Sequence, residues 1–306
     1  TTGGHFGYLK IAEGCDKHCT YCIIPSLRGR FRSVPEERLL AQAEYMASQG
    51  VKELILVAQE TTVYGTDLYG KKTLHILLKK LCQIKGIRWI RVLYCYPEEI
   101  YDELIQTMKE EKKICHYLDL PIQHASDRIL KRMGRRTTQA ELVAIVNKLR
   151  QEIPDIVLRT TLISGFPGET QEDHKELMGF VDEMEFDRLG VFTYSPEEDT
   201  PAATMPDQVA EEVKEARRDE IMELQQEISY DKGTDRIGQE LLVMIEGKVA
   251  DESAYIGRTY GDAPKVDGYI FVQTGELLMT GDFAKVRVTG ALEYDLIGEL
   301  ADEYTE

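Results

Sequence analysis

The sequence predicts an α/β fold in which six βα units form a partial parallel barrel, followed by a small and separate β-barrel. Apolar, β-rich segments alternate with amphipathic helical segments up to about residue 195, and short strands replace this pattern after about residue 231. A length of 306 residues suits one large core with a small second domain. Because a complete barrel has eight units, six units leave one side open to a large substrate.

Each of the six units begins with a strand candidate. The strand candidates are residues 6–12, 53–58, 89–95, 116–120, 157–163 and 188–194. Helical patterns fill the gaps at residues 35–48, 73–83, 98–109, 138–152 and 170–183. This alternation predicts a parallel sheet that is curved into an incomplete, TIM-like barrel.

The carboxyl-terminal part has a different pattern. Residues 196–206 form a turn-rich connection, and residues 207–230 form a highly charged helix that returns over the partial barrel. Glycines then punctuate five short strands, at residues 240–248, 254–258, 268–271, 284–290 and 294–299. We therefore expect one domain at residues 1–230 and an all-β, OB-like barrel at residues 231–306.

The charge balance is acidic, with 37 Lys and Arg against 54 Asp and Glu and a net charge of -17. Residues 231–306 contain 16 acidic and 7 basic residues. This balance argues against a broad electrostatic grip on nucleic acid and favours a basic protein partner. We expect the barrel carboxylates, among them Asp251, Glu252, Asp262 and Asp267, to face that partner.

No apolar run is long enough to span a bilayer, so no membrane association is expected. The chain shows no signal-peptide pattern and has six cysteines, which favours a reducing cytosol over disulfide formation. Cys82, Cys95 and Cys115 lack mutual metal-ligand spacing, and we expect them to be buried, reduced thiols.

The other three cysteines, Cys15, Cys19 and Cys22, form a Cys-x-x-x-Cys-x-x-Cys triplet in the run EGCDKHCTYC. No fourth cysteine or histidine stands at ligand spacing, although structural zinc sites and tetrathiolate clusters both need four ligands. Three thiolates therefore leave one iron of a [4Fe-4S] cluster open to a small molecule. Zinc that borrows His18 or a distant ligand, and inert core thiols, are the alternatives.

The triplet spacing, with Tyr21 before the last cysteine, is similar to that of the radical S-adenosylmethionine (radical SAM) enzymes. Glu60, Thr61 and Thr62 in AQETTVYG match the family motif that holds the amino group of SAM, with Gln59 a weaker candidate. A carboxylate and hydroxyls can accept the protons of an ammonium group. A solvated loop is the alternative.

Two further strand ends carry residues that the resemblance assigns to SAM. Gln123, His124 and Ser126 in DLPIQHAS are placed to meet ribose hydroxyls, the methionine carboxylate or the substrate, and His124 is also the candidate catalytic residue. Ser126 can instead cap the following helix. In RTTLISGFPGET, the adenine-binding strand of the family corresponds to Ile163, Gly165, Phe166 and Gly168, although a plain helix-entry turn has the same composition.

Three other positions complete the predicted site. Arg159 can pair with the methionine carboxylate or form a structural ion pair within its strand. Tyr194, in TYSPEEDTPA at the end of the sixth strand, is a further cofactor-binding candidate. Arg28 and Arg30 after the cysteines either offset the negative charge of the cluster or belong to an exposed basic loop.

Together, GYLKIAEGCDKHCTYCIIPSLRGRFRS, AQETTVYG, LPIQHAS, ISGFPGET and TYSPEEDTPA resemble the methylthiotransferase branch of the radical SAM enzymes, and the acidic tail resembles their TRAM domain. The resemblance implies that a reduced cluster passes an electron to SAM and that the resulting 5′-deoxyadenosyl radical removes a hydrogen from the substrate. A second SAM supplies the methyl group, so two are used in each turnover. An electron donor is also implied.

The branch has two main subfamilies. One methylthiolates the β-carbon of an aspartate in ribosomal protein S12, and the other methylthiolates an adenosine in tRNA. His124, the run Glu197-Glu198-Asp199 and the acidic barrel favour the first subfamily and make tRNA the weaker partner. Asp199 departs from the glycine that both subfamilies usually have.

The resemblance also implies an amino-terminal domain in which three further cysteines bind an auxiliary [4Fe-4S] cluster. Nothing in this chain matches that domain. We therefore expect the chain to be the catalytic core and TRAM part of a longer protein, able to cleave SAM but not to complete sulfur transfer.

Overall fold

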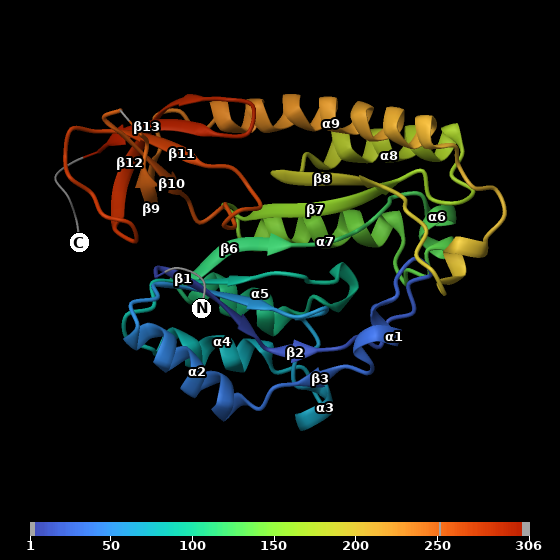
Figure 1. The fold of residues 1–306 in the computed structure, drawn as a ribbon, viewed down its shortest axis with the longest axis horizontal. Coiled ribbons are helices and arrows are strands. Elements are labelled where there is room, and N and C mark those ends of the chain that lie inside the picture. Colours follow the sequence, from blue (N-terminus) through green and yellow to red (C-terminus); the bar gives the residue numbers. More distant parts are fainter. Residues whose placement is uncertain (1–3, 251, 302–306) are drawn as a thin grey trace.

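The computed structural model describes residues 4–250 and 252–301, which form a six-stranded parallel sheet and a closed five-stranded barrel (Figure 1). The sheet has the order β1-β4-β5-β6-β7-β8, so each strand lies beside the next main strand of the chain. Its members are β1 (Phe6–Lys10), β4 (Glu53–Val57), β5 (Trp89–Val92), β6 (Ile114–Asp119), β7 (Val157–Ser164) and β8 (Arg188–Thr193). The predicted partial barrel is confirmed.

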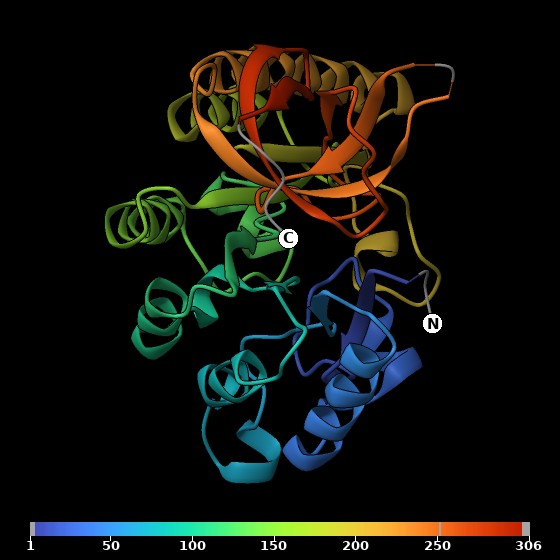
Figure 2. The ribbon, with the colours of Figure 1, turned by 90° about the vertical axis from the view of Figure 1, so that its left-hand side faces the viewer.

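Helices cover the outer face of the curved sheet, as Figure 2 shows. They are α2 (Glu36–Ser48), α4 (Leu74–Cys82), α5 (Asp102–Glu110), α6 (Asp127–Arg132), α7 (Gln139–Glu152) and α8 (Gln171–Met184). Side chains alternate along each strand, so Leu54 and Leu56 pack against the helices whereas Ile55 faces the concave side. Two of these helices begin with a capping box, at Thr138 and Thr170.

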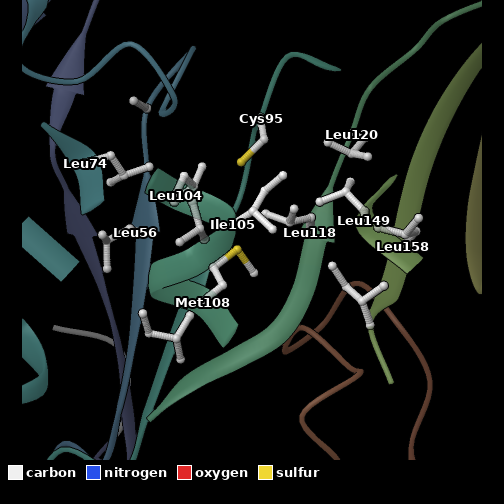
Figure 3. Close-up of a cluster of buried hydrophobic side chains, with 14 of the residues drawn as sticks. Leu56, Leu74, Cys95, Leu104, Ile105, Met108, Leu118, Leu120, Leu149 and Leu158 are labelled. Atoms are coloured by element: carbon white, nitrogen blue, oxygen red, sulfur yellow. The ribbon is translucent and has the colours of Figure 1, made fainter. Parts of the chain in front are cut away.

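The main core lies between the sheet and these helices. Figure 3 shows part of it, where leucines of β4 and β6 meet Leu104, Ile105 and Met108 of α5. Cys95 belongs to this cluster, is fully buried and is a free thiol, as predicted. Cys82 and Cys115 are also buried and free.

Several short elements were not predicted. Gly14 has a φ of 84°, and a Cβ there would stand 2.2 Å from the Arg30 carbonyl oxygen, so only glycine allows the chain to turn away from the sheet. The chain then returns through α1 (Ile24–Arg28), and β2 (Ala12–Glu13) pairs with β3 (Arg32–Ser33). Two more short elements are α3 (Thr66–Tyr69) and the 3₁₀ turn η1 (Pro97–Glu99), which replaces the start of the expected helix 98–109.

The connection to the small barrel differs slightly from the prediction. After a second 3₁₀ turn, η2 (Pro201–Thr204), the helix α9 (Glu211–Thr234) begins and ends about four residues later than expected. Asp199 keeps a positive φ of 63°, which is the conformation that glycine adopts most easily. Helix α9 packs on α8 and β8, with Ile221 fully buried. No helix of residues 4–250 and 252–301 is long and apolar enough to cross a membrane.

The small barrel closes with the order β10-β11-β13-β12-β9. Its strands are β9 (Glu240–Lys248), β10 (Ala254–Arg258), β11 (Ile270–Gln273), β12 (Phe283–Ala291) and β13 (Leu296–Leu300). Only β11 and β13 pair in parallel, and the other neighbours are antiparallel. The five strands were predicted, with β11 two residues further along the chain.

The small barrel packs against the amino-terminal ends of the sheet strands. Phe6 and Trp89, each the first residue of its strand, share an apolar cluster with Met244 and Phe283 of the barrel. Behind this cluster, Glu53 accepts from Arg91 Nε at 2.8 Å and from Arg258 Nη2 at 2.5 Å. The barrel therefore closes this end of the concave face.

Two carboxylates expected on the acidic surface of the barrel are instead part of this interface. Asp262 pairs with Arg188 at 2.6 Å and Asp267 pairs with Arg159 at 3.2 Å, and each side chain is 3% exposed. The expectation that they face a partner was wrong, because they neutralise arginines of the sheet. Glu252 is exposed, and Asp251 lies outside the described residues.

Candidate active site

At the opposite end of the sheet, the cysteine loop and the carboxyl-terminal ends of β1, β4 and β5 line a cavity of about 520 Å³. Parallel barrels build their active sites at this end. The residues that line it include Lys10, Cys15, Cys22, Gln59, Tyr94 and Tyr96. Cysteine-loop residues and residues that follow β4 and β5 therefore share one space.

Backbone N–H groups of the cysteine loop donate hydrogen bonds to Gln59 after β4 and to Met133 at the end of α6. Gly14 donates its N–H to Gln59 Oε1 at 2.9 Å, and Cys15 donates its N–H to the Gly29 carbonyl at 3.2 Å. Further along, Thr20 donates to the Met133 carbonyl at 2.9 Å. Gln59 thus anchors the start of the loop.

The loop thiols suit a cluster. Cys15 and Cys19 are buried, Cys22 is half-buried, and all three are free. Burial raises the pKa of Cys15 to about 11, so a bare thiolate is unfavourable there and the positive charge of bound iron would stabilise it. Within residues 4–250 and 252–301, no three His, Cys, Asp or Glu side chains converge on a single metal ion.

Glu60 is a buried carboxylate with a free oxygen. It is 1% exposed, and its Oε1 accepts from the N–H of Thr62 at 3.1 Å and from the hydroxyl of the same residue. Its Oε2 has no hydrogen-bond partner in the described part of the chain. Burial raises the pKa of Glu60 to about 7. The cavity residue Tyr96 donates its N–H to Oε1 at 3.4 Å, so Glu60 lies directly behind the cavity wall.

The two threonines after Glu60 have other partners. The Thr61 hydroxyl donates to the carbonyl of Leu93 at 2.8 Å, which fixes the end of β5. Thr62 is fully buried and bonded to Glu60. These side chains hold the carboxylate and the neighbouring strand end in place.

His124 is placed to support a loop. It is fully buried; its Nδ1 accepts from the Ser126 N–H at 3.0 Å, and its Nε2 therefore carries the proton that it donates to Glu169 at 3.0 Å. Glu169 also accepts from Arg217 Nη1 at 2.8 Å and from the Gly165 N–H. Both ring nitrogens of His124 are therefore bonded to protein groups, and its catalytic role stays a prediction.

The neighbours of His124 differ in their roles. Ser126 precedes α6 in the N-cap position, but its hydroxyl donates to Asp173 at 2.7 Å and does not cap the helix. Gln123 has a φ of 70° and bridges to Leu162, and its side chain is half-buried. Gln123 is therefore the member of this motif that still borders solvent.

Four predicted cofactor residues meet in one cluster. Phe166 stands edge-on to Tyr21, with ring centroids 6.4 Å apart, and to Tyr194, at 5.4 Å. Ile163 packs against the same group. The Tyr194 hydroxyl is buried without a hydrogen-bond partner among the described residues. The structure thus brings together residues from the cysteine loop, β7 and the segment after β8.

Both side-chain packing and a positive φ favour glycine at positions 165 and 168. Their φ values are 69° and 83°, and a Cβ would stand 2.2 Å from Lys214 Cγ at the first and 2.9 Å from the Arg132 guanidinium at the second. Side chains from α9 and α6 therefore fill the space next to each glycine.

The predicted arginines have structural partners. Arg159 pairs with Asp119 at 2.9 Å as well as with Asp267, which agrees with the structural alternative. Arg28 forms an exposed pair with Glu13 at 3.2 Å. Arg30 lies near the base of the loop, where its carbonyl approaches Gly14.

Sequence reasoning missed Tyr96, Tyr94 and Lys10. The Tyr96 hydroxyl lies 3.6 Å from Cys19 Sγ, and Tyr94 has a φ of 57° that is held by an N–H bond to Asp119 at 3.1 Å. The run LYCYP follows a strand, which is the signal that marks a candidate site in this fold.

Comparisons with known proteins agree with this geometry. Residues 9–181 match the radical SAM superfamily, and residues 237–301 match the TRAM domain. The chain is 65% identical to the ribosomal protein uS12 methylthiotransferase RimO of Lachnoclostridium phytofermentans, over 97% of this chain and 68% of that protein. It is 54% identical to the RimO of Clostridium perfringens, over 99% and 67% respectively.

Solved structures share the fold. Coproporphyrinogen III oxidase (HemN) from Escherichia coli aligns with a TM-score of 0.57 and 16% identity, over 93% of this chain and 67% of that one. The methyltransferase TsrM from Kitasatospora setae aligns with a TM-score of 0.54 and 17% identity, over 65% and 39%. The superfamily match and these relatives show that the chain belongs to the radical SAM superfamily and, within it, to the family of the uS12 methylthiotransferases called RimO.

Proposed function

We propose that this chain is the radical SAM core and TRAM part of an enzyme that methylthiolates the β-carbon of an aspartate in ribosomal protein uS12. The identity of 65% to a uS12 methylthiotransferase over 97% of the chain carries this proposal. The cavity beside the cysteine loop supports it, because it joins the predicted cluster ligands to an open end of the barrel. In the proposed domain division, residues 1–230 form the catalytic domain and residues 231–306 the TRAM domain.

Cys15, Cys19 and Cys22 would hold a [4Fe-4S] cluster, and one iron would remain without a protein ligand. When bound, the cluster supplies the electron for reductive cleavage of SAM, which is chemistry that the protein side chains cannot perform. The protein contributes the anchored loop, the shape of the cavity and the exclusion of water. The proposal includes an electron donor and an auxiliary cluster in a further domain.

Glu60 is the proposed partner of the SAM ammonium group. An ammonium would satisfy Oε2, which lacks a partner in the described structure, and a charge-assisted bond in a buried place is strong. Tyr21, Ile163, Phe166 and Tyr194 are proposed to form the apolar side of the nucleoside site, with Gln123 at its polar edge. The supporting observation is that the four apolar and aromatic residues come from three separate segments and pack in one cluster.

Replacement of Glu60 by glutamine should weaken SAM binding about 10- to 100-fold, because a neutral amide loses the charge-assisted bond to the ammonium. In the wild type, SAM affinity should rise as the pH increases through about 7, since the carboxyl group is protonated below its raised pKa. Isothermal titration with SAM at several pH values measures both effects. Equal affinity at all pH values, or an unchanged affinity in Glu60→Gln, would contradict the assignment.

Hydrogen abstraction can be tested on this chain without sulfur transfer. A uS12 peptide with deuterium on the β-carbon of its target aspartate should transfer deuterium to 5′-deoxyadenosine in the presence of reconstituted protein, SAM and a chemical reductant. Mass spectrometry of the nucleoside detects this transfer. A tRNA adenosine substrate serves as the second arm and represents a MiaB-like activity. The uS12 proposal would be refuted if 5′-deoxyadenosine formed with the peptide contained no deuterium while tRNA stimulated SAM cleavage.

A further inference from the structure

Lys10 is a basic residue that lines the cavity, and none of the proposed cofactor contacts uses it. It is the last residue of β1, and its side chain is on the concave face of the sheet, two positions after Tyr8. It lines the same cavity as Cys15 and Cys22, and its side chain is 58% exposed. Among the lining residues in the described part of the chain, it is the only cation.

Other cations near the cavity have close partners. Lys17 is hydrogen bonded to Glu99, and Arg159 is held between two aspartates. Arg135 is buried and stacks on the Tyr96 ring, with its guanidinium carbon 4.2 Å from the ring centroid. If Arg159 turned to a ligand, two buried aspartates would lose their cation, and neither Lys17 nor Arg135 is among the residues that line the cavity.

The ion pair of Lys10 is exchangeable. Its Nζ lies 3.2 Å from Glu13, whose side chain is 30% exposed and is shared with Arg28 at 3.2 Å. If Lys10 swings to another anion, Glu13 keeps Arg28 as its partner. Exposed pairs of this kind contribute little to stability, so the exchange costs little free energy.

We propose that Lys10 binds the side-chain carboxylate of the substrate aspartate and so determines the choice of residue. This inference rests on the proposed function. In aspartate the β-carbon is bonded directly to the carboxyl carbon, so a reaction at the β-carbon brings the carboxylate into the same cavity. An anion that leaves water needs a cation or several donors, and Lys10 is the side chain available to supply the charge.

The exposed rings near Lys10 suit a polypeptide substrate. Tyr8 and Tyr94 are 38% and 48% exposed, and they belong to the concave face and the end of β5. Aromatic rings supply contact area to a peptide chain, while the lysine supplies the charge that distinguishes aspartate from its neutral amide.

The test compares Lys10→Met with Glu13→Gln and with the wild type, all carrying a reconstituted cluster and SAM. Two labelled uS12 peptides are used, one with the target aspartate and one with asparagine in its place. Fluorescence anisotropy gives the peptide affinities, titration calorimetry gives the SAM affinity, and deuterium transfer reports hydrogen abstraction.

The wild type should prefer the aspartate peptide, and Lys10→Met should bind it about 10- to 100-fold more weakly and lose the preference over asparagine. SAM affinity should not change. Glu13→Gln should keep the preference, because it removes the partner of Lys10 but not the cation. Loss of the preference in both variants would point to a structural pair and overturn the proposal.

Two other results would overturn the assignment in distinguishable ways. If Lys10→Met keeps the aspartate preference, or loses SAM affinity instead, Lys10 does not recognise the substrate carboxylate. If the wild type binds neither peptide and transfers no deuterium, the proposed function fails and the assignment of Lys10 fails with it.

Discussion

Replacement of Cys15, Cys19 or Cys22 by alanine is expected to abolish both cluster assembly and the formation of 5′-deoxyadenosine. Anaerobically reconstituted wild type should contain about four irons and about four sulfides in this site, which needs all three thiolates. Removal of one ligand leaves a second iron exposed to solvent. Iron and sulfide analysis, together with chromatography of the nucleoside product, measures both losses.

The matched control is Cys82→Ala. Cys82 is a buried free thiol on the core side of α4, and it lies outside the cavity. This variant should keep the full iron content and SAM cleavage. Full SAM cleavage in any of the three loop variants would overturn the cluster assignment.

The largest effect on stability is expected from Glu53→Gln. Glu53, Arg91 and Arg258 are fully buried; Glu53 is the carboxylate that pairs with Arg91, and it shares Arg258 with Glu246. Burial alone would raise the pKa of Glu53, but the charges of Arg91 and Arg258 hold this pKa below its usual value. The neutral amide would leave two buried guanidinium groups without their shared anion, at a cost of about 3–5 kcal/mol in the free energy of unfolding.

Chemical denaturation at neutral pH measures this difference. Glu152→Gln is the control, because the pair that Glu152 forms with Lys109 is exposed and should contribute no more than about 1 kcal/mol. The stabilisation by Glu53 is present above the unfolded pKa of about 4.3 and is lost as the pH falls through the lower folded pKa. Equal stability of Glu53→Gln and wild type would contradict the account, because it would show that the buried charge of Glu53 does not stabilise the fold.

The main strands and helices were predictable because the alternation of buried strands with amphipathic helices is a local property of the sequence. The short elements around the cysteines were not, because β2 and β3 pair across 20 residues and depend on the turn at Gly14. The position of Pro97 explains the shortened helix α5, since η1 starts at this proline and α5 begins only at Asp102.

In the site, the sequence predicts roles for the cysteines and Glu60 because each is a distinctive residue at a strand end. It could not separate residues that touch a ligand from those that support them. His124 and Ser126 have polar side chains at a strand end, yet contacts with Glu169 and Asp173 turn both into the protein. Such partners lie more than 40 residues away and become visible only in the folded chain.

Surface charge was the least predictable property. The acidic excess of residues 231–306 suggested an acidic face, but Asp262 and Asp267 bind arginines of the sheet. The total charge of a segment does not reveal which carboxylates are buried against cations of another segment. The same limit hid Lys10, because only the fold shows that it lines one cavity with Cys15 and Cys22.

The most direct test of the proposed function is mass spectrometry of ribosomal protein uS12 and of total tRNA from a strain that lacks this gene. Loss of the methylthio group from the uS12 aspartate, with 2-methylthioadenosine in tRNA unchanged, is the predicted result. An unmodified tRNA adenosine together with fully modified uS12 would contradict it.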